Sequence, residues 1–277
     1  MTAYVLPGLL AGLVAIAVTV AIERWGGRVG GLLGTLPTTI VPASLGIAAQ
    51  TDAQGLAGAM YAVPAAMLLN ALFLWLWRWL PPRLPEMSLP RRLGVMTSLS
   101  LTAWFAGAAG VTISLTSLGD SIPRLAAAGV LATLAILVVG IVACLGARPA
   151  PRGKRSVGPL TLLARGLLAA VAIATAVWVT NIGGPLAAGV ASVFPAIFVT
   201  TMVSLWLSQG EAVPVGAVGP MMLGSASVAT YALLAANLLP LLGPWIGTPI
   251  AWIAAVASTT LPSWWWLASR AEKATEG

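Results

Sequence analysis

Long uncharged stretches alternate with short charged segments along the whole chain. A helix that crosses a bilayer needs about 20 mostly apolar residues, so each uncharged stretch of that length predicts a transmembrane helix. We therefore expect an all-α, polytopic membrane protein with about nine transmembrane helices. The predicted spans cover residues 3–22, 29–50, 56–77, 93–118, 125–147, 159–180, 185–208, 212–239 and 245–269.

The amino-acid composition further limits the class of protein that this chain can be. Of 277 residues, 59% are hydrophobic and 8% are charged, whereas soluble domains carry about 25% charged residues. A water-soluble globular protein is therefore excluded. Histidine is absent and the one cysteine is Cys144, so we expect no cofactor and no metal site. Without a histidine, paired interior acids or a nucleophile beside a base, we also expect no enzymatic activity.

Positive charges orient the predicted spans. Thirteen of the 14 Lys and Arg residues fall on one side of the membrane in this topology, and Arg124 falls on the other. Because cytoplasmic loops are enriched in Lys and Arg, we expect the N-terminus outside and the C-terminus in the cytoplasm of a bacterial plasma (inner) membrane. The net charge of +7 then belongs to loops that meet anionic lipid, and a nucleic-acid partner is not expected.

The chain also repeats itself at a nearly constant offset. Residues 24–27 (RWGG) correspond to residues 181–184 (NIGG) at an offset of 157, and residues 34–37 (GTLP) correspond to residues 192–195 (SVFP) at 158. Chance matches among abundant Gly and Ala are the alternative explanation. An odd number of predicted crossings separates the two copies, so true copies would be inverted relative to each other.

The repeat predicts how the chain is divided. We expect two inverted repeats of four helices each, joined by a connecting helix, with a short cytoplasmic tail at the end of the second repeat. The first repeat covers residues 1–118, the connecting helix and a cytoplasmic loop cover residues 119–158, and the second repeat covers residues 159–277.

Prolines interrupt the second predicted span of each repeat, at Pro37 and Pro42 in the first repeat and at Pro195 in the second. Pro37 and Pro195 each remove one backbone N–H and displace a carbonyl, which frees polar groups inside the membrane. Transporters built from inverted repeats bind solutes at such broken helices, whereas kinks and close helix contacts are the simpler explanation. Hydroxyls on these spans, and an amide before the second one, would line the path. The candidate substrate-binding residues are Gly34, Thr35, Pro37, Thr38, Asn181, Ser192, Pro195 and Thr200.

Two acidic residues occupy related positions at opposite rims of the predicted spans. Asp52 follows the second span and Glu211 follows the seventh, which makes both of them gate candidates; solvated loop carboxylates are the alternative. No Asp or Glu lies within a predicted span, so no proton relay is expected. An interior with hydroxyls and helix ends but no carboxylate favours a neutral or anionic solute over a cation.

One stretch of the second half resembles a known family. The glycine pair Gly183-Gly184, Pro195 and residues 216–225 form a pattern that resembles the sulfite and sulfonate exporters of the TauE/SafE type. This resemblance implies inverted halves with glycine-rich helix breaks. The stretch from the glycine pair to the proline is longer in this chain, so no substrate and no residue role is carried over.

These patterns lead to two functional hypotheses. The first is a secondary transporter or facilitator for a small neutral or anionic solute, working by alternating access at a site between two broken helices. Its partners would be the lipid bilayer and the solute, and a homo-oligomer remains open. The second is a non-transporting integral membrane subunit or scaffold of a larger complex, in which the broken helices only serve helix packing.

Overall fold

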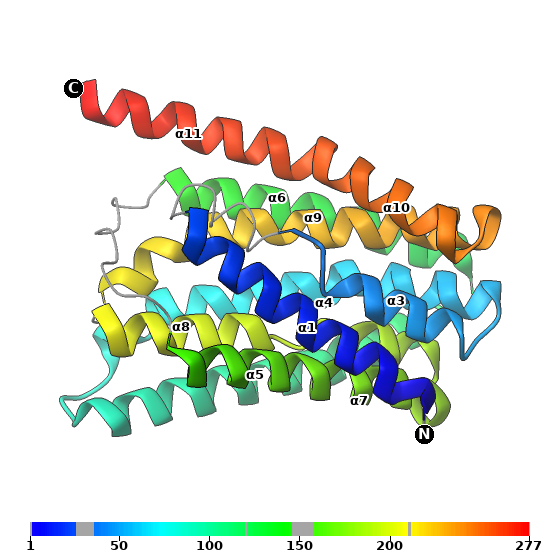
Figure 1. Cartoon of the computed structure of the whole chain (residues 1–277), viewed down its shortest axis with the longest axis horizontal. Helices are drawn as coiled ribbons and strands as arrows, with labels where there is room; N and C mark the ends of the chain where they lie inside the picture. The colour runs from blue at the N-terminus through cyan, green and yellow to red at the C-terminus, as the bar shows by residue number, and fades with distance from the viewer. Residues whose placement is uncertain (1, 26–35, 120, 146–157, 210–211, 277) are drawn as a thin grey trace.

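The computed structural model describes residues 2–25, 36–119, 121–145, 158–209 and 212–276. These residues form helices joined by short connections, with no strand among them (Figure 1). The predicted all-α fold class is confirmed for the described residues, and five of their helices are long and apolar enough to cross a membrane. They are α4 (Ala53–Trp79), α5 (Leu89–Ser117), α6 (Ile122–Leu145), α7 (Pro159–Ala191) and the Val218–Leu242 part of α9 (Ala212–Leu242).

The remaining predicted spans correspond to other helices. The first corresponds to α1 (Thr2–Trp25), and the described part of the second contains only the short α3 (Ile40–Ala48). The seventh is divided between the end of α7 and α8 (Ala196–Gln209). The ninth consists of α10 (Pro244–Ala255), a π-helical turn (Val256–Thr260) and α11 (Leu261–Glu276) in direct succession.

The helices lie along one long axis, so the bundle has two ends (Figure 1). At one end α3 turns into α4 at Asp52; we call it the Asp52 end. At the other end α4 is connected to α5 through a short 3-10 helix (Pro81–Arg83), close in sequence to Arg91 and Arg92; we call it the arginine-rich end. Helix α1 starts at the Asp52 end, and α11 finishes at the arginine-rich end.

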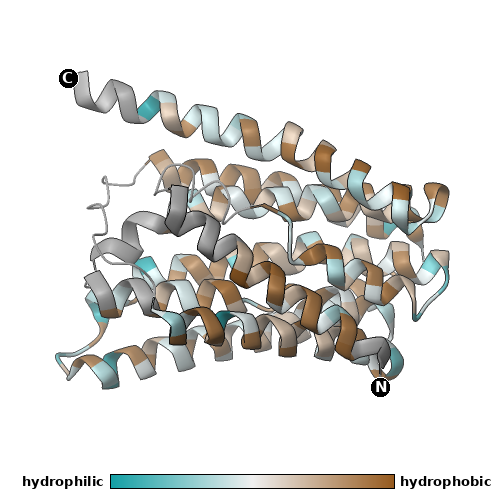
Figure 2. Cartoon of the chain, viewed as in Figure 1, coloured by the Kyte–Doolittle hydropathy of each residue, from teal (hydrophilic) through white to brown (hydrophobic). Residues whose placement is uncertain are grey.

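Helix α4 forms the centre of the bundle. It packs against α9, α6, α7 and α5, and Met60, Val63 and Ala66 on it are fully buried. The surrounding helices turn large apolar side chains outward, for example Ile113 on α5 and Leu131 on α6 (Figure 2). A bilayer tolerates such an apolar exterior, which water would not, so this arrangement fits helices embedded in lipid.

Small residues bring α1 and α7 into close contact. A Cβ atom added to Gly12 would lie 2.7 Å from the Gly166 carbonyl oxygen, and one added to Gly8 would lie 2.6 Å from the Ala170 carbonyl oxygen. The sequence order of these two pairs is opposite on the two helices, so α1 and α7 are antiparallel. Side chains larger than hydrogen at these glycines would push the helices apart.

Candidate functional site

The first predicted break, at Pro37, lies directly before α3, and the residues that precede Leu36 are outside the described part of the chain. Residues 36–39 form a tight turn in which the Thr38 N–H donates a hydrogen bond to the Leu36 carbonyl oxygen (2.7 Å) across the buried Pro37. Thr39 is the N-cap of α3, and its side chain makes no capping hydrogen bond. Helix α3 starts in the middle of the bundle and runs toward the Asp52 end (Figure 1).

The second broken helix has the same local arrangement. Helix α7 is divided at Gly184, whose backbone (φ 76°, ψ 175°) is open to glycine but strained for other residues. Its second part ends at Ala191, and in the turn that follows the Ala196 N–H donates to the Phe194 carbonyl oxygen (2.7 Å) across Pro195. Helix α8 then runs from the middle of the bundle toward the arginine-rich end (Figure 1). Its direction is therefore opposite to that of α3.

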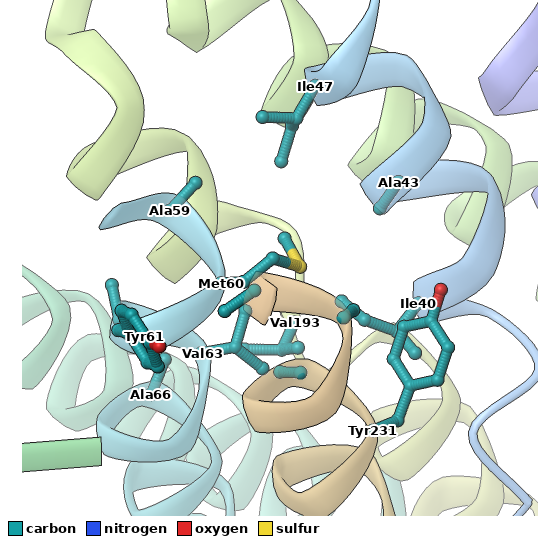
Figure 3. Packing of buried hydrophobic residues seen from close by; sticks show 14 of the residues in the cluster. Ile40, Ala43, Ile47, Ala59, Met60, Tyr61, Val63, Ala66, Val193 and Tyr231 are labelled. Carbon is teal, nitrogen blue, oxygen red and sulfur yellow. The ribbon is translucent and has the colours of Figure 1, made fainter. Parts of the chain in front are cut away.

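Apolar side chains fill the space where the two breaks approach each other. Figure 3 shows Ile40 of α3, Met60 and Val63 of α4, and Val193 of the second break gathered in one cluster. All four belong to the main hydrophobic core and are buried. The start of α3 and the second break therefore share one apolar core, and side chains fill the space between them in this conformation.

Three predicted site hydroxyls lie within the described residues, those of Thr38, Ser192 and Thr200, and each of them lies near a carbonyl of its own segment. Ser192 Oγ donates to the Gly189 carbonyl oxygen (2.7 Å), and Thr200 Oγ1 donates to the Ala196 carbonyl oxygen (2.9 Å). Thr38 Oγ1 lies 3.5 Å from the Leu36 carbonyl oxygen, at the limit of a hydrogen bond. Such bonds satisfy a hydroxyl in a membrane interior without any solute.

Other predicted site residues lie away from this cluster or outside the described residues. Asn181 is exposed on α7, before the break at Gly184. Asp52 is exposed and caps α4, where its Oδ1 accepts a hydrogen bond from the Gly55 N–H (2.8 Å). Gly34, Thr35 and Glu211 lie outside the described residues.

Sequence reasoning missed a buried polar link at the second break. Asn70 of α4 donates from Nδ2 to the Val193 carbonyl oxygen (2.7 Å), and its Oδ1 accepts a hydrogen bond from Trp104 Nε1 (2.8 Å) of α5. The asparagine is 2% exposed. The sequence signal was a single amide in an apolar span, which predicts a bond to a neighbouring helix but not to which one.

A second buried polar link lies on the α3 side. Ser44 Oγ and Tyr231 Oη are 2.8 Å apart, and this contact joins α3 to α9. Thr248 of α10 is buried near the same phenol, although its Oγ1 meets no partner at hydrogen-bond geometry. Hydrogen bonds between buried groups fix which faces of two helices meet, because an unpaired polar atom in this environment is costly.

No known protein family, curated protein or solved structure matches this chain. The resemblance to the TauE/SafE exporters therefore rests on the glycine and proline pattern alone. Within the described part of the chain, no group of three or more His, Cys, Asp and Glu residues is placed to hold a metal ion. The chemistry of this site has to be inferred from its backbone geometry and from the side chains around it.

Proposed function

We propose that this protein is a secondary transporter or facilitator for a small neutral or anionic solute. The pathway would run between the two broken helices, around Pro37 and Pro195, and would open to the two sides of the membrane in turn. The matching turns at these two prolines carry the proposal. The membrane would be the bacterial inner membrane, with the N-terminus outside, as the distribution of Lys and Arg suggests.

The turns at the two prolines support an internal duplication. Residues 36–38 and residues 194–196 are separated by the same offset of 158, and each turn is closed by a hydrogen bond of 2.7 Å from the residue after the proline to the residue before it. The helices that follow run in opposite directions (Figure 1). Related segments with opposite directions are what inverted repeats would produce.

Contacts between α1 and α7 support the same symmetry. Adding 158 to Gly8 gives Gly166, and adding 158 to Gly12 gives Ala170. The observed contacts pair Gly8 with Ala170 and Gly12 with Gly166, so the offset converts each contact into the other. A two-fold axis between repeats requires this exchange. Two inverted repeats of four helices around α6 would account for nine crossings if both broken helices span the membrane.

Helix starts inside the bundle favour a solute that accepts hydrogen bonds. The first N–H groups of a helix have no partner within it and carry a partial positive charge, which attracts anions and polar oxygens. Both α3 and α8 start in mid-bundle, and Thr39 leaves the first of these ends without a side-chain cap. Among the described residues, no Asp or Glu is buried, so nothing there would neutralise a cation.

A two-stage experiment tests this proposal. Purified protein is first heated with a panel of small organic anions, inorganic oxyanions and uncharged solutes, because a ligand that binds the folded state raises the apparent stability by about 2.7 kcal/mol at 100 times its Kd. The stabilising solute is then loaded into liposomes with and without the protein. We expect protein-dependent flux that Ser192→Phe abolishes, since Ser192 is buried at the second break, while exposed Ser114→Phe on α5 keeps it.

The contrary result would favour the scaffold hypothesis. The apolar filling between the breaks and the self-bonded hydroxyls of Ser192 and Thr200 are also what a purely structural bundle would show. Three results together would contradict transport: no solute of the panel stabilises the protein, liposomes with the protein show no added flux, and a partner co-purifies in fixed stoichiometry. Normal flux in Ser192→Phe would contradict the placement of the pathway.

A further inference from the structure

We propose that Asn70 and Tyr231 are positioning residues that hold the two broken helices closed from opposite ends of the bundle. Removing the Asn70 link would open the pathway toward the arginine-rich end, and removing the Tyr231 link would open it toward the Asp52 end. The Asn70 link consists of Asn70, Trp104 and the Val193 carbonyl; the Tyr231 link consists of Tyr231 and Ser44. This inference rests on the proposed transport function but can be tested without knowing the solute.

The Asn70 link ties the second break to two other helices. The amide nitrogen of Asn70 donates to the break, and its amide oxygen accepts from Trp104 of α5. The Trp104 ring also packs edge-on against Phe194, the next residue in the break, with ring centroids 5.3 Å apart. A shift of α5 would therefore act on the break both through a hydrogen bond and through an aromatic contact.

The Tyr231 link holds α3 in a similar way. Ser44 lies one turn after Ile40, where α3 starts, and its hydroxyl lies 2.9 Å from the Val41 carbonyl oxygen as well as beside the Tyr231 phenol. Tyr231 is fully buried in the core near Ile40 (Figure 3). This phenol therefore ties the beginning of α3 to the long helix α9.

The two links are reciprocal in position but different in chemistry. Each link joins a break in one half of the chain to a long helix of the other half. The Tyr231 link joins α3 to α9, and the Asn70 link joins the break before α8 to α4. The repeat positions of Ser44 and Tyr231, at an offset of 158, are Met202 and Phe73, which are both apolar and buried. At the second break the polar contact comes instead from Asn70, which lies one turn before Phe73 on α4. Because the links share no residue, a substitution can weaken one of them alone.

Each link should control a different side. From its break, α3 runs to the Asp52 end, and α8 runs to the arginine-rich end (Figure 1). Loosening α3 therefore opens a route toward the Asp52 end, whereas loosening the start of α8 opens a route toward the arginine-rich end. A gate on each side of a central site is the requirement for alternating access.

Site-directed labelling measures the two openings separately. Cys144 is the one cysteine of the chain, so Cys144→Ala gives a cysteine-free background. Two reporters are introduced one at a time, Ala43→Cys on α3 and Met202→Cys on α8, both at fully buried positions. Membrane vesicles of known sidedness are treated with a membrane-impermeant maleimide from either face, and the initial labelling rate is measured.

We expect two opposite, one-sided effects. Tyr231→Phe should raise labelling of Ala43→Cys from the Asp52 end about five- to tenfold, the equilibrium effect of losing one hydrogen bond, and should leave Met202→Cys unchanged. Asn70→Leu should raise labelling of Met202→Cys from the arginine-rich end by a similar factor and leave Ala43→Cys unchanged. Trp104→Phe, which keeps a ring beside Phe194 but removes the indole donor, should act like Asn70→Leu in a weaker form.

Controls separate a gating role from general loosening. Thr133→Val on α6 removes a buried hydroxyl that bonds to the Gly129 carbonyl of its own helix, and should change neither reporter. Equal increases at both reporters in Asn70→Leu and Trp104→Phe, or no increase in any of the three variants, would overturn the inference. If the reporters respond from one side each while no solute crosses liposomes, the links are gates of a protein that does not transport, and the proposed function fails instead.

Discussion

At the scale of single residues, glycines set how closely the helices approach. A Cβ atom on Gly189 would collide with the backbone carbonyl of Ala59, because the second part of α7 lies directly against α4 there. Gly110 on α5 has no atom within 4 Å of such a Cβ. The same residue type therefore has a steric role at one position and none at the other. Composition alone does not distinguish the two.

This difference predicts the effect of a single methyl group. Gly189→Ala should lower the free energy of unfolding by about 1–3 kcal/mol, because backbone must move to admit the methyl group. Gly110→Ala should be neutral or stabilise by up to about 1 kcal/mol through the higher helix propensity of Ala. Denaturant titration of both variants in the same detergent gives the comparison. Equal stability of the two variants would contradict the close contact between α7 and α4.

Polar residues at this scale were harder to interpret from sequence. Asp52 was a gate candidate, and the structure gives it a local bond as the N-cap of α4. Ser192 and Thr200 stood out as hydroxyls near a break, yet they bond to their own backbone. Asn70 was not among the predicted site residues, although its amide bonds to the second break from another helix. Hydrogen-bond partners depend on helix rotation, which the position of a residue along the chain does not fix.

At the scale of helices, the turns at Pro37 and Pro195 lie where the prolines predict them, whereas Pro42 lies inside α3 and does not interrupt it. Proline removes a backbone donor wherever it occurs, so the interruptions at Pro37 and Pro195 follow from local chemistry. The sequence predicted two separate spans, 159–180 and 185–208. In the structure α7 continues past residue 180 instead and bends at Gly184. Its second part then returns toward the middle of the bundle before α8 starts (Figure 1).

The bend at Gly184 gives a prediction for this element. Gly184→Ala should cost about 1–3 kcal/mol of folding free energy, since its backbone angles lie in a region that is open essentially to glycine. Gly94→Ala on α5, where a Cβ would meet no atom within 4 Å, is the matched control and should not be destabilised. Thermal unfolding followed by circular dichroism measures both. A Gly184→Ala protein as stable as the control would contradict the bend.

At the scale of the whole molecule, burial and charge are arranged along one axis. The central α4 is buried along most of its apolar stretch, whereas α5, α6 and α7 expose apolar side chains around it (Figure 2). Arg83 lies in the 3-10 helix between α4 and α5, and Arg91 and Arg92 lie in the first turn of α5, so all three belong to the arginine-rich end. These features fit a bundle whose long axis crosses a bilayer, and the proposed orientation would place its arginine-rich end at the cytoplasmic surface.

Labelling from the two sides of the membrane tests this orientation. In the Cys144→Ala background, Gln54→Cys at the Asp52 end should react with an impermeant maleimide in intact cells, because it would face outward. Glu86→Cys at the arginine-rich end should react only after the membrane is permeabilised. Both positions are exposed in the fold, so failure to react reports sidedness and not burial. Reaction of both from the same side would contradict a bundle that spans the membrane.

The amino-acid sequence by itself determined the helical content, the apolar helices long enough to cross a membrane and the turns at Pro37 and Pro195. These properties depend on local quantities, since apolar length, backbone hydrogen bonding in lipid and the missing proline N–H all act within one segment. Tertiary structure decided which polar groups meet. Asn70 reaches a carbonyl 123 residues away, and Ser44 lies beside a phenol 187 residues away. Such pairs arise only when helices adopt particular rotations and crossing positions, which packing of the whole bundle selects.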